Sequence, residues 1–450
     1  MMVNRKSIFA LALLLSALPF SGKAQNSADM RLYFGETLKK GSTAGIDVPE
    51  KKISVSKIGS VRQAVWEAWR QANEAFEEEK LIPLKPIDTA NSGKWLLPDS
   101  LEPQATLNYY FVSKGEQPSG GYPLFLYLHG SGPRDREWAT GLKLAQMFQD
   151  APSLYFIPQI PNEGPWYRWY QRSKQFAWER LLRQALLRSD VNPDKVYVFG
   201  ISEGGYGSQR IASFYADYWA AAGPMAGGEP LKNAPAENLR NIGFSLRTGA
   251  IDKGFYRNIL TGYTADALDS LELLMPEGFR HKVELIPERG HHIDYAPTTP
   301  WLRNFTRNAV PHHVNWEDYP MDGRYRTGFY NIAVLKRPAG DGRTYYQMDI
   351  NRAENKVTLT VDDVTYRTVQ RDSIWGIEMK FERDYKPAEQ MGFRLYLDET
   401  MIDFYRPVTV TVNGRTVFEG KVRPNLKAML ASVATFYDPR RIFPAFIDIE

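Results

Sequence analysis

Cysteine is absent from all 450 residues of the chain. This absence excludes disulfide bonds, thiolate metal sites, a cysteine nucleophile and lipid attachment through a cysteine. A chain of this length can still bury enough apolar surface to fold without covalent cross-links. The stability of the folded state therefore depends on its core.

A marked excess of charge of either sign is also missing. Lys and Arg number 56 against 52 Asp and Glu, which leaves a formal net charge of +4. The basic residues form no tract along the chain, so nothing in the charge pattern indicates binding to nucleic acid. We therefore do not expect a nucleic acid partner.

Long apolar runs are scarce, and the run at the N-terminus is typical of a secretory signal. Arg5 precedes the apolar stretch 7–20, and Ala24 is a small residue just before a plausible cleavage site. The stretch is shorter than the about 20 residues that a membrane span needs. We expect residues 1–24 to be a signal peptide and the mature protein to be periplasmic or secreted, without a membrane anchor. An uncleaved anchor or a buried helix is the alternative.

Residues 25–105 show little regular pattern apart from one amphipathic helix. Apolar residues recur there at helical spacing, and they are Val61, Val65, Trp69, Ala72 and Phe76. A stripe of this kind indicates a helix that packs one face against a core. We interpret the segment as an N-terminal addition to the main fold.

Residues 106–310 alternate between apolar strands and helices. The predicted strands cover 106–113, 122–128, 154–158, 195–199, 218–223, 243–248 and 282–286, and the predicted helices cover 141–148, 173–189 and 206–215. Strands that are apolar along their whole length and separated by helices are typical of a mostly parallel sheet covered on both faces. This region is therefore predicted to be an α/β domain.

Residues 311–450 are predicted to form a separate β-rich domain, with a sandwich as the expected architecture. The predicted strands cover 325–334, 345–350, 356–361, 373–381, 393–397, 408–412 and 416–419. Asn413 and Gly414 separate the last two strands, and Asn-Gly between alternating strands is a strong hairpin signal. The region could bind carbohydrate, shape a pocket or stabilise the chain.

A candidate nucleophile lies in the run Gly200-Ile201-Ser202-Glu203-Gly204, which matches G-x-S-x-G. The pattern alone is weak, but here it follows an apolar strand and precedes a helix. A nucleophilic serine of this class lies on a tight strand-to-helix turn, where glycines leave the necessary room. We predict Ser202 to be the nucleophile; an ordinary glycine-rich turn is the alternative.

A serine hydroxyl needs a base, which is normally histidine. The chain has only six histidines: His129, His281, His291, His292, His312 and His313. In enzymes with such a turn the partners follow in the order Ser, Asp or Glu, and then His. His291 follows the last predicted strand of the α/β region and is the predicted base, with His292 as the alternative.

The third member of a triad orients the imidazole and stabilises its charged form. Asp252 leaves the strand 243–248, which lies between the serine and the histidine in the sequence. We predict Asp252 to be this acid. A plain turn role is the alternative for Asp252, and Asp294 is the reserve candidate.

A tetrahedral intermediate requires two backbone N–H donors. One is expected from Glu203, directly after the nucleophile, and the other from the loop that follows the strand 122–128. That loop reads His129-Gly130-Ser131-Gly132, and Ser131 is the predicted donor.

These motifs together resemble the α/β-hydrolase superfamily. More narrowly, they are similar to bacterial secreted esterases of the putative-esterase, polyhydroxybutyrate-depolymerase-like and prolyl-oligopeptidase-like groups. The resemblance extends over residues 123–293 and rests on 128–132, 192–205 and 288–291. It implies a Ser–Asp–His triad, with ester or amide substrates. Glu203 departs from these esterases, which often carry an apolar residue after the serine, so the polarity of the pocket is expected to differ.

An aromatic cluster precedes the helix 173–189. Trp166, Tyr167 and Trp169 are predicted to line the substrate pocket, which would suit sugar rings or aromatic acyl groups. Core packing is the alternative for these side chains. An aromatic loop in an exported esterase leads to the hypothesis that the enzyme removes acyl groups from polysaccharide.

The overall prediction is an exported serine hydrolase that cleaves carboxylic esters of small molecules or carbohydrates without a cofactor or metal. A serine peptidase of the prolyl-oligopeptidase type is one alternative, although the repeated blades of its propeller are not visible in the sequence. A non-catalytic binding protein on a hydrolase scaffold is another. A metal site at 291–294 is a weaker one, because no metal-ligand spacing supports it.

Overall fold

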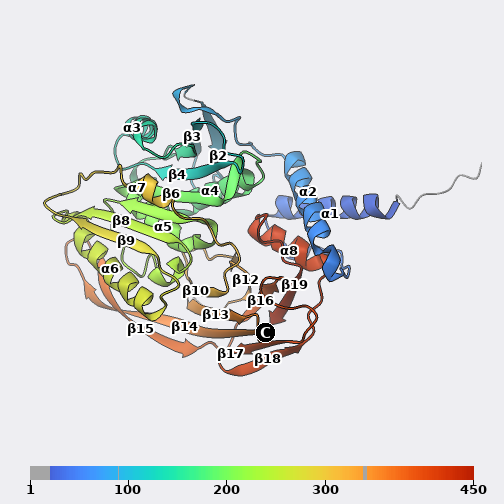
Figure 1. Cartoon of the computed structure of the whole chain (residues 1–450). Coiled ribbons are helices and arrows are strands. Elements are labelled where there is room, and N and C mark those ends of the chain that lie inside the picture. Colours follow the sequence, from blue (N-terminus) through green and yellow to red (C-terminus); the bar gives the residue numbers. More distant parts are fainter. Residues whose placement is uncertain (1–20, 90, 338–341) are drawn as a thin grey trace, which may run out of the picture.

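The computed structural model describes residues 21–89, 91–337 and 342–450 (Figure 1). Residues 1–20 of the predicted signal peptide lie outside these ranges, and its last four residues begin the helix α1 (Ser21–Lys40). Cleavage and export therefore stay predictions. No helix among the described residues combines the length and the apolar character that a membrane span requires.

A nine-stranded sheet dominates the described part of the chain. Its strands are β1 (Lys85–Pro86), β2 (Ser92–Leu96), β3 (Thr106–Lys114), β4 (Tyr122–Leu128), β5 (Ser153–Pro158), β6 (Val191–Ile201), β7 (Ala221–Met225), β8 (Gly243–Gly249) and β9 (His281–Ile286). They follow the order β3-β5-β4-β6-β7-β8-β9, with β1 and β2 both pairing with β3.

The direction of the strands identifies the fold. β4 to β9 are parallel, whereas β3 runs antiparallel to its neighbour β5. This strand order, with β3 antiparallel near the first edge of the sheet, is that of the α/β-hydrolase fold. The predicted α/β class is thus confirmed.

Helices cover both faces of this sheet, as its apolar strands require. The helices are α3 (Arg134–Met147), α4 (Arg172–Leu186), α5 (Glu203–Phe214), α6 (Arg257–Leu274) and α7 (Thr298–Leu302). Residues of α3 and α7 belong to the core on one face, and residues of α4, α5 and α6 to the core on the other (Figure 1). Every residue of β4 is buried between these layers, which explains its unbroken apolar sequence.

The C-terminal region forms two further sheets. One contains β10 (His313–Asp318), β13 (Arg343–Asn351), β14 (Lys356–Arg371), β15 (Glu378–Pro387), β17 (Val408–Val412) and β18 (Arg415–Gly420); the other contains β11 (Gly328–Phe329), β12 (Ile332–Lys336), β16 (Gly392–Leu397) and β19 (Ala445–Ile449).

The two sheets pack face to face through aromatic side chains. Trp316 of β10 stacks on Phe329 of β11 with ring centroids 5.2 Å apart, and Tyr346 of β13 meets Phe393 of β16 at 5.7 Å. The predicted hairpin is present between β17 and β18, where Asn413 and Gly414 both have positive φ.

The helix α8 (Leu426–Phe436) was not expected from the sequence. It is capped by Asn425, whose side chain accepts a hydrogen bond from the backbone N–H of Ala428 at 2.8 Å. α8 packs against α2 (Ile58–Ala75), and Trp69 of α2 stacks on Tyr437 at 5.9 Å. The N-terminal segment is thereby attached to the end of the chain, and one hydrophobic cluster includes residues of all three predicted segments.

A buried ionic network also joins the α/β region to the C-terminal region. Asp217, after α5, accepts hydrogen bonds from Arg326 at 3.0 Å and from Arg441 at 2.5 Å. Asp438 accepts further bonds from Arg441 and Arg307, both at 2.7 Å. Burial opposes the ionisation of Asp438, but Arg307 and Arg441 lower its pKa to about 2. Buried charges of this kind are tolerated because each has a partner.

Replacing Asp217 with Asn keeps the shape of the side chain but leaves two buried arginines without their common partner. We expect the free energy of unfolding to fall by about 3–5 kcal/mol, measured by urea denaturation. Asp384→Asn, at an exposed position of β15, is the matched control and should change it by less than about 0.5 kcal/mol. Equal effects of the two substitutions would contradict this account.

Candidate active site

Ser202 lies on the turn between β6 and α5. Its backbone has φ 58° and ψ −113°, a conformation that is strained for any residue with a side chain. A Cβ atom at Gly200 or at Gly204 would collide with backbone atoms, at Gly204 with the carbonyl oxygen of Leu128. The two glycines of the G-x-S-x-G motif are therefore required by the crowding of this turn.

Ser202, His291 and Asp252 form a continuous chain of hydrogen bonds. The hydroxyl of Ser202 lies 2.9 Å from Nε2 of His291, and Nδ1 of His291 lies 2.8 Å from a carboxylate oxygen of Asp252. Asp252 can only accept, so Nδ1 of His291 carries a proton and Nε2 is free to accept from Ser202. The three predicted residues thus meet in the geometry that proton removal from serine requires.

The alternatives to this trio lie elsewhere. His292 is exposed, and its ring centroid lies 6.0 Å from that of His291. The hydrogen bond to the hydroxyl of Ser202 is made by His291 and not by His292. Asp294 is exposed too and accepts from the N–H of Ala296. Among the residues that the structure describes, no group of three or more acidic or histidine side chains is arranged to hold a metal ion.

Arg257 is a contact of the trio that sequence patterns did not indicate. At the start of α6, its guanidinium donates to the second carboxylate oxygen of Asp252 at 2.9 Å. The same guanidinium lies over the rings of Phe255, at 5.3 Å, and Tyr206, at 5.7 Å. Arg257 therefore links the acid of the trio to aromatic side chains nearby.

The loop after β4 lies against the nucleophile. A Cβ atom built on Gly130 would be 3.5 Å from the Cβ of Ser202. His129 is buried and holds the loop: its Nε2 accepts from the N–H of Ile160 at 3.1 Å, and its Nδ1 donates to the oxygen of Gly130 at 2.8 Å. Burial lowers the pKa of His129 to about 4, so the ring is neutral at pH 7. The predicted oxyanion donor Ser131 follows on the exposed side of this loop.

The predicted pocket-lining role of Trp166, Tyr167 and Trp169 is not what the structure shows. Trp169 is fully buried, and its indole N–H donates to the oxygen of His129 at 2.9 Å. The hydroxyl of Tyr167 bonds to Gly130 at 3.0 Å, and Trp166 lies outside the lining of the cavity. Tyr167 and Trp169 therefore stabilise the loop after β4 through hydrogen bonds to its backbone oxygens, and both side chains are buried.

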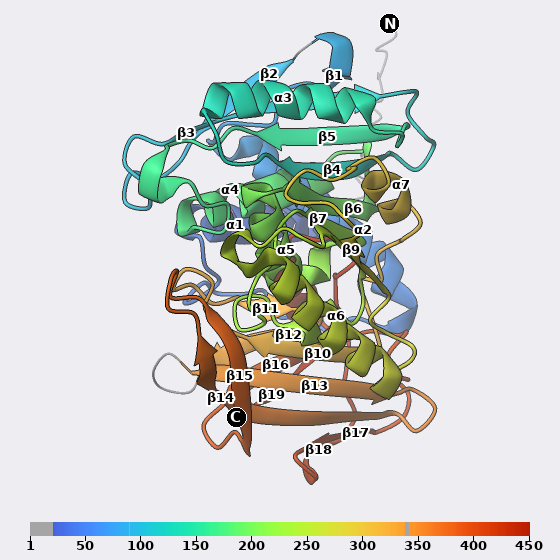
Figure 2. The same cartoon turned by 90° about the vertical axis from the view of Figure 1, so that its left-hand side faces the viewer.

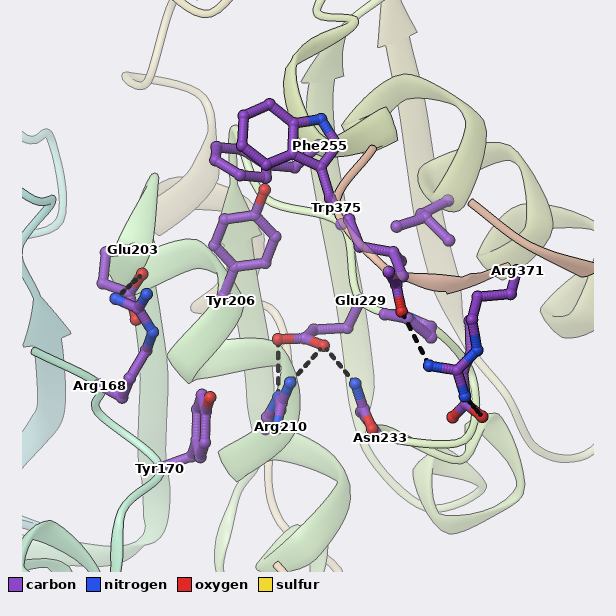
Figure 3. Close-up of a pocket in the computed structure, with 16 residues that line it drawn as sticks. Arg168, Tyr170, Glu203, Tyr206, Arg210, Glu229, Asn233, Phe255, Arg371 and Trp375 are labelled. Atoms are coloured by element: carbon purple, nitrogen blue, oxygen red, sulfur yellow. Dashed lines mark hydrogen bonds and ion pairs between the residues drawn. The ribbon is translucent and has the colours of Figure 1, made fainter. Parts of the chain in front are cut away.

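A cavity of about 570 Å³ adjoins Glu203, the residue that directly follows the nucleophile, while Ser202, His291 and Asp252 themselves are not part of its lining (Figure 3). One face of α5 contributes three residues to it, α6 contributes Leu260, and the remaining residues come from the segments between these elements and from the β14–β15 hairpin. The lining residues are Arg168, Tyr170, Glu203, Tyr206, Arg210, Gly228, Glu229, Pro230, Asn233, Phe255, Leu260, Arg371, Trp375, Gly376, Ile377 and Glu378. Arg168 and Tyr170, the neighbours of the predicted aromatic residues, are the ones that reach this cavity.

Glu203 combines a predicted backbone role with an unusual side chain. Glu203 is 8% exposed, and one of its carboxylate oxygens accepts a hydrogen bond from Arg168 at 3.3 Å, while the other is buried without a partner. Burial raises the pKa of Glu203 to about 7, although Arg168 acts in the opposite direction. Glu203, which stands where related esterases often carry an apolar residue, is therefore partly protonated near neutral pH.

Comparison with known proteins gives partial likenesses in structure. No protein-family model and no curated protein matches the chain. A thermostable esterase is 20% identical, with 49% of this chain and 64% of that chain covered and a TM-score of 0.41, so this chain spans less than two thirds of its length.

Two further solved structures are similar over part of the chain. The ferulic acid esterase AmCE1/Fae1A of Anaeromyces mucronatus is 13% identical, covering 46% of this chain and 85% of that one, with a TM-score of 0.35. The esterase Est2 of Thermogutta terrifontis is 12% identical, with coverages of 46% and 85% and a TM-score of 0.36. The assignment of the fold rests on the strand order and not on these scores.

Glu203→Gln tests the burial of this carboxyl through stability. The folded state binds the proton more tightly than the unfolded chain, because the pKa of Glu203 rises from 4.5 to about 7 on folding. Ionisation therefore weakens the folded state, and the stability contributed at low pH is lost as the pH rises through about 7. We expect the melting temperature of the variant, relative to the wild type, to increase between pH 4 and pH 8.

Glu116→Gln, at an exposed position, provides the control and should show a constant difference from the wild type over this range. If the pH profile of Glu203→Gln also runs parallel to that of the wild type, Glu203 does not titrate as its burial implies.

Proposed function

We propose that the protein is a serine hydrolase that cleaves carboxylic esters through an acyl-enzyme. The observation that carries this proposal is the chain of hydrogen bonds from Ser202 through His291 to Asp252, presented on a strained turn. Backbone strain of this kind costs about 1–3 kcal/mol and persists where the position serves chemistry. A scaffold used only for binding has no need to keep the nucleophile in this conformation.

The reaction follows from the placement of these groups. The hydroxyl oxygen of Ser202 attacks the ester carbonyl while Nε2 of His291 takes its proton, and Asp252 stabilises the resulting imidazolium. The oxyanion is bound by the backbone N–H groups of Glu203 and Ser131. His291 then gives the proton to the departing alcohol, and a water molecule releases the acyl group by the same route.

Esters of carbohydrate are the proposed substrate class. The cavity that adjoins Glu203 is lined with charged and amide side chains together with Tyr206, Phe255 and Trp375, a combination that suits a hydroxyl-rich molecule. Removal of acyl groups from polysaccharide accordingly belongs to the proposal, as does export directed by residues 1–24.

Hydrolysis of p-nitrophenyl acetate by the purified protein tests the nucleophile and the base. We expect kcat/KM to fall by about 10⁴ or more in Ser202→Ala and in His291→Ala, because neither residue has a substitute within reach. His292→Ala is the matched control, since its exposed ring makes no bond to Ser202, and it should keep the activity of the wild type. Activity that survives Ser202→Ala would overturn the proposal.

Asp252→Asn tests the orienting role of the carboxylate in the same assay. The amide is nearly isosteric but can donate to His291, which disfavours the tautomer that accepts from Ser202. We expect kcat to fall by about 10⁴ with little change in KM. A fall in kcat of less than tenfold would show that Asp252 does not set the tautomer of His291.

A further inference from the structure

The hairpin formed by β14 and β15 extends from the C-terminal region to the candidate active site. β14 pairs with β15 up to Arg371 and Glu378, and these residues and the tip between them reach the cavity that adjoins Glu203. Figure 2 shows the two strands projecting past the rest of their sheet towards the start of α6. The tip is anchored there, because the hydroxyl of Tyr256 donates to the carboxylate of Asp372 at 2.6 Å.

Two exposed aromatic rings meet where the hairpin touches the α/β region. Trp375 of the tip is 56% exposed and Phe255 is 41% exposed, with ring centroids 4.5 Å apart (Figure 3). Phe255 follows Asp252 by three residues, so the pair lies close to the candidate triad. Large exposed aromatic faces beside a cavity are typical of binding sites.

Backbone strain holds one of these rings in place. Phe255 and Tyr256 both have positive φ, at 51° and 58°. Two consecutive residues with bulky side chains in this region are costly, and strain of this kind gathers at functional sites. The turn directs Phe255 to Trp375 and Tyr256 to the anchoring Asp372, so the conformation serves the junction with the hairpin.

The charges that line the cavity balance one another. Arg210 and Glu229 form a two-pronged ion pair at 2.6 and 2.9 Å, Arg371 donates to Glu378 at 2.8 Å, and Arg168 to Glu203 at 3.3 Å. Three arginines thus face three glutamates, which leaves little net charge to attract an ionic ligand. Paired planar groups of this kind still offer donors and acceptors to a neutral ligand.

Two polar groups in this wall are buried and not fully paired. One carboxylate oxygen of Glu203 has no hydrogen bond, and the hydroxyl of Tyr206, one turn away on α5, has the guanidinium of Arg257 as its partner, which leaves its own O–H without an acceptor. A buried polar atom without a hydrogen bond is costly, and a bound ligand that carries hydroxyl groups would satisfy both. An apolar or purely aromatic acyl group would leave them unpaired.

We propose that Trp375 and Phe255 form a subsite for a neutral sugar ring, with Glu203 and Tyr206 binding its hydroxyl groups. The β14–β15 hairpin therefore gives the C-terminal region a direct part in substrate recognition. This inference rests on the proposed ester hydrolase and specifies its substrate. The sugar stacks on the aromatic pair while the ester carbonyl reaches Ser202.

The test measures binding of neutral oligosaccharides without hydrolysis. The full-length Ser202→Ala protein is titrated calorimetrically with the hexaoses of xylose, glucose and mannose, each free of acyl groups. We expect at least one of them to bind, and Trp375→Ala in the same background to raise its Kd about tenfold, as loss of one stacking contact implies. Trp375→Phe should recover most of the affinity.

Ile374→Ala is the matched control, because Ile374 is 72% exposed on the same tip and does not line the cavity. It should leave the Kd unchanged. Absence of binding by every hexaose, a Kd that does not respond to Trp375→Ala, or an equal response to Ile374→Ala would each overturn the subsite.

The two proposals fail separately. Loss of p-nitrophenyl acetate hydrolysis in Ser202→Ala concerns the nucleophile alone, whereas the titrations do not depend on turnover. An aromatic acyl ligand is a distinct outcome: if no hexaose binds, whereas methyl ferulate binds to the Ser202→Ala protein and Trp375→Ala weakens that binding, the aromatic pair binds acyl groups and the sugar subsite is wrong.

Discussion

The crowded turn at Ser202 is the constraint on which the rest of the site depends. β6 ends and α5 begins around one residue, so the turn passes too close to Leu128 at the end of β4 to allow a side chain at Gly204. This closeness brings the loop after β4 against Ser202 and points the first turn of α5 into the cavity. His291 and Asp252 reach the same point from the ends of the neighbouring parallel strands β9 and β8.

The trio could be predicted because each member belongs to a local pattern. Ser202 lies within a spaced glycine motif, and Asp252 and His291 each follow an apolar strand whose carboxyl end meets the same edge of the sheet. The run of aromatic residues before α4 does not show which of its side chains pack in the core and which line a pocket. The sequence therefore predicts that Trp169 lines the pocket, whereas the indole N–H of this residue bonds to His129 in the loop after β4.

Contacts between distant parts of the sequence could not be predicted in this way. Arg257 binds Asp252 from the start of a helix with no distinguishing motif, and Trp375 comes to the cavity from a strand hairpin more than a hundred residues later. The contact made by Trp375 depends on how far β14 and β15 extend as a pair. The buried pairing of Asp217 with Arg441 likewise follows only from the packed structure, which joins the C-terminal region to the α/β sheet.

The most direct test of the account is covalent labelling of the nucleophile by phenylmethylsulfonyl fluoride, located by mass spectrometry of peptides. Sulfonyl fluorides react with serines that a neighbouring base activates. We expect a single adduct on Ser202 in the wild type, and a much slower reaction in His291→Ala. Labelling of another serine, or an equal rate at Ser202 in the two proteins, would contradict the claim that His291 activates Ser202.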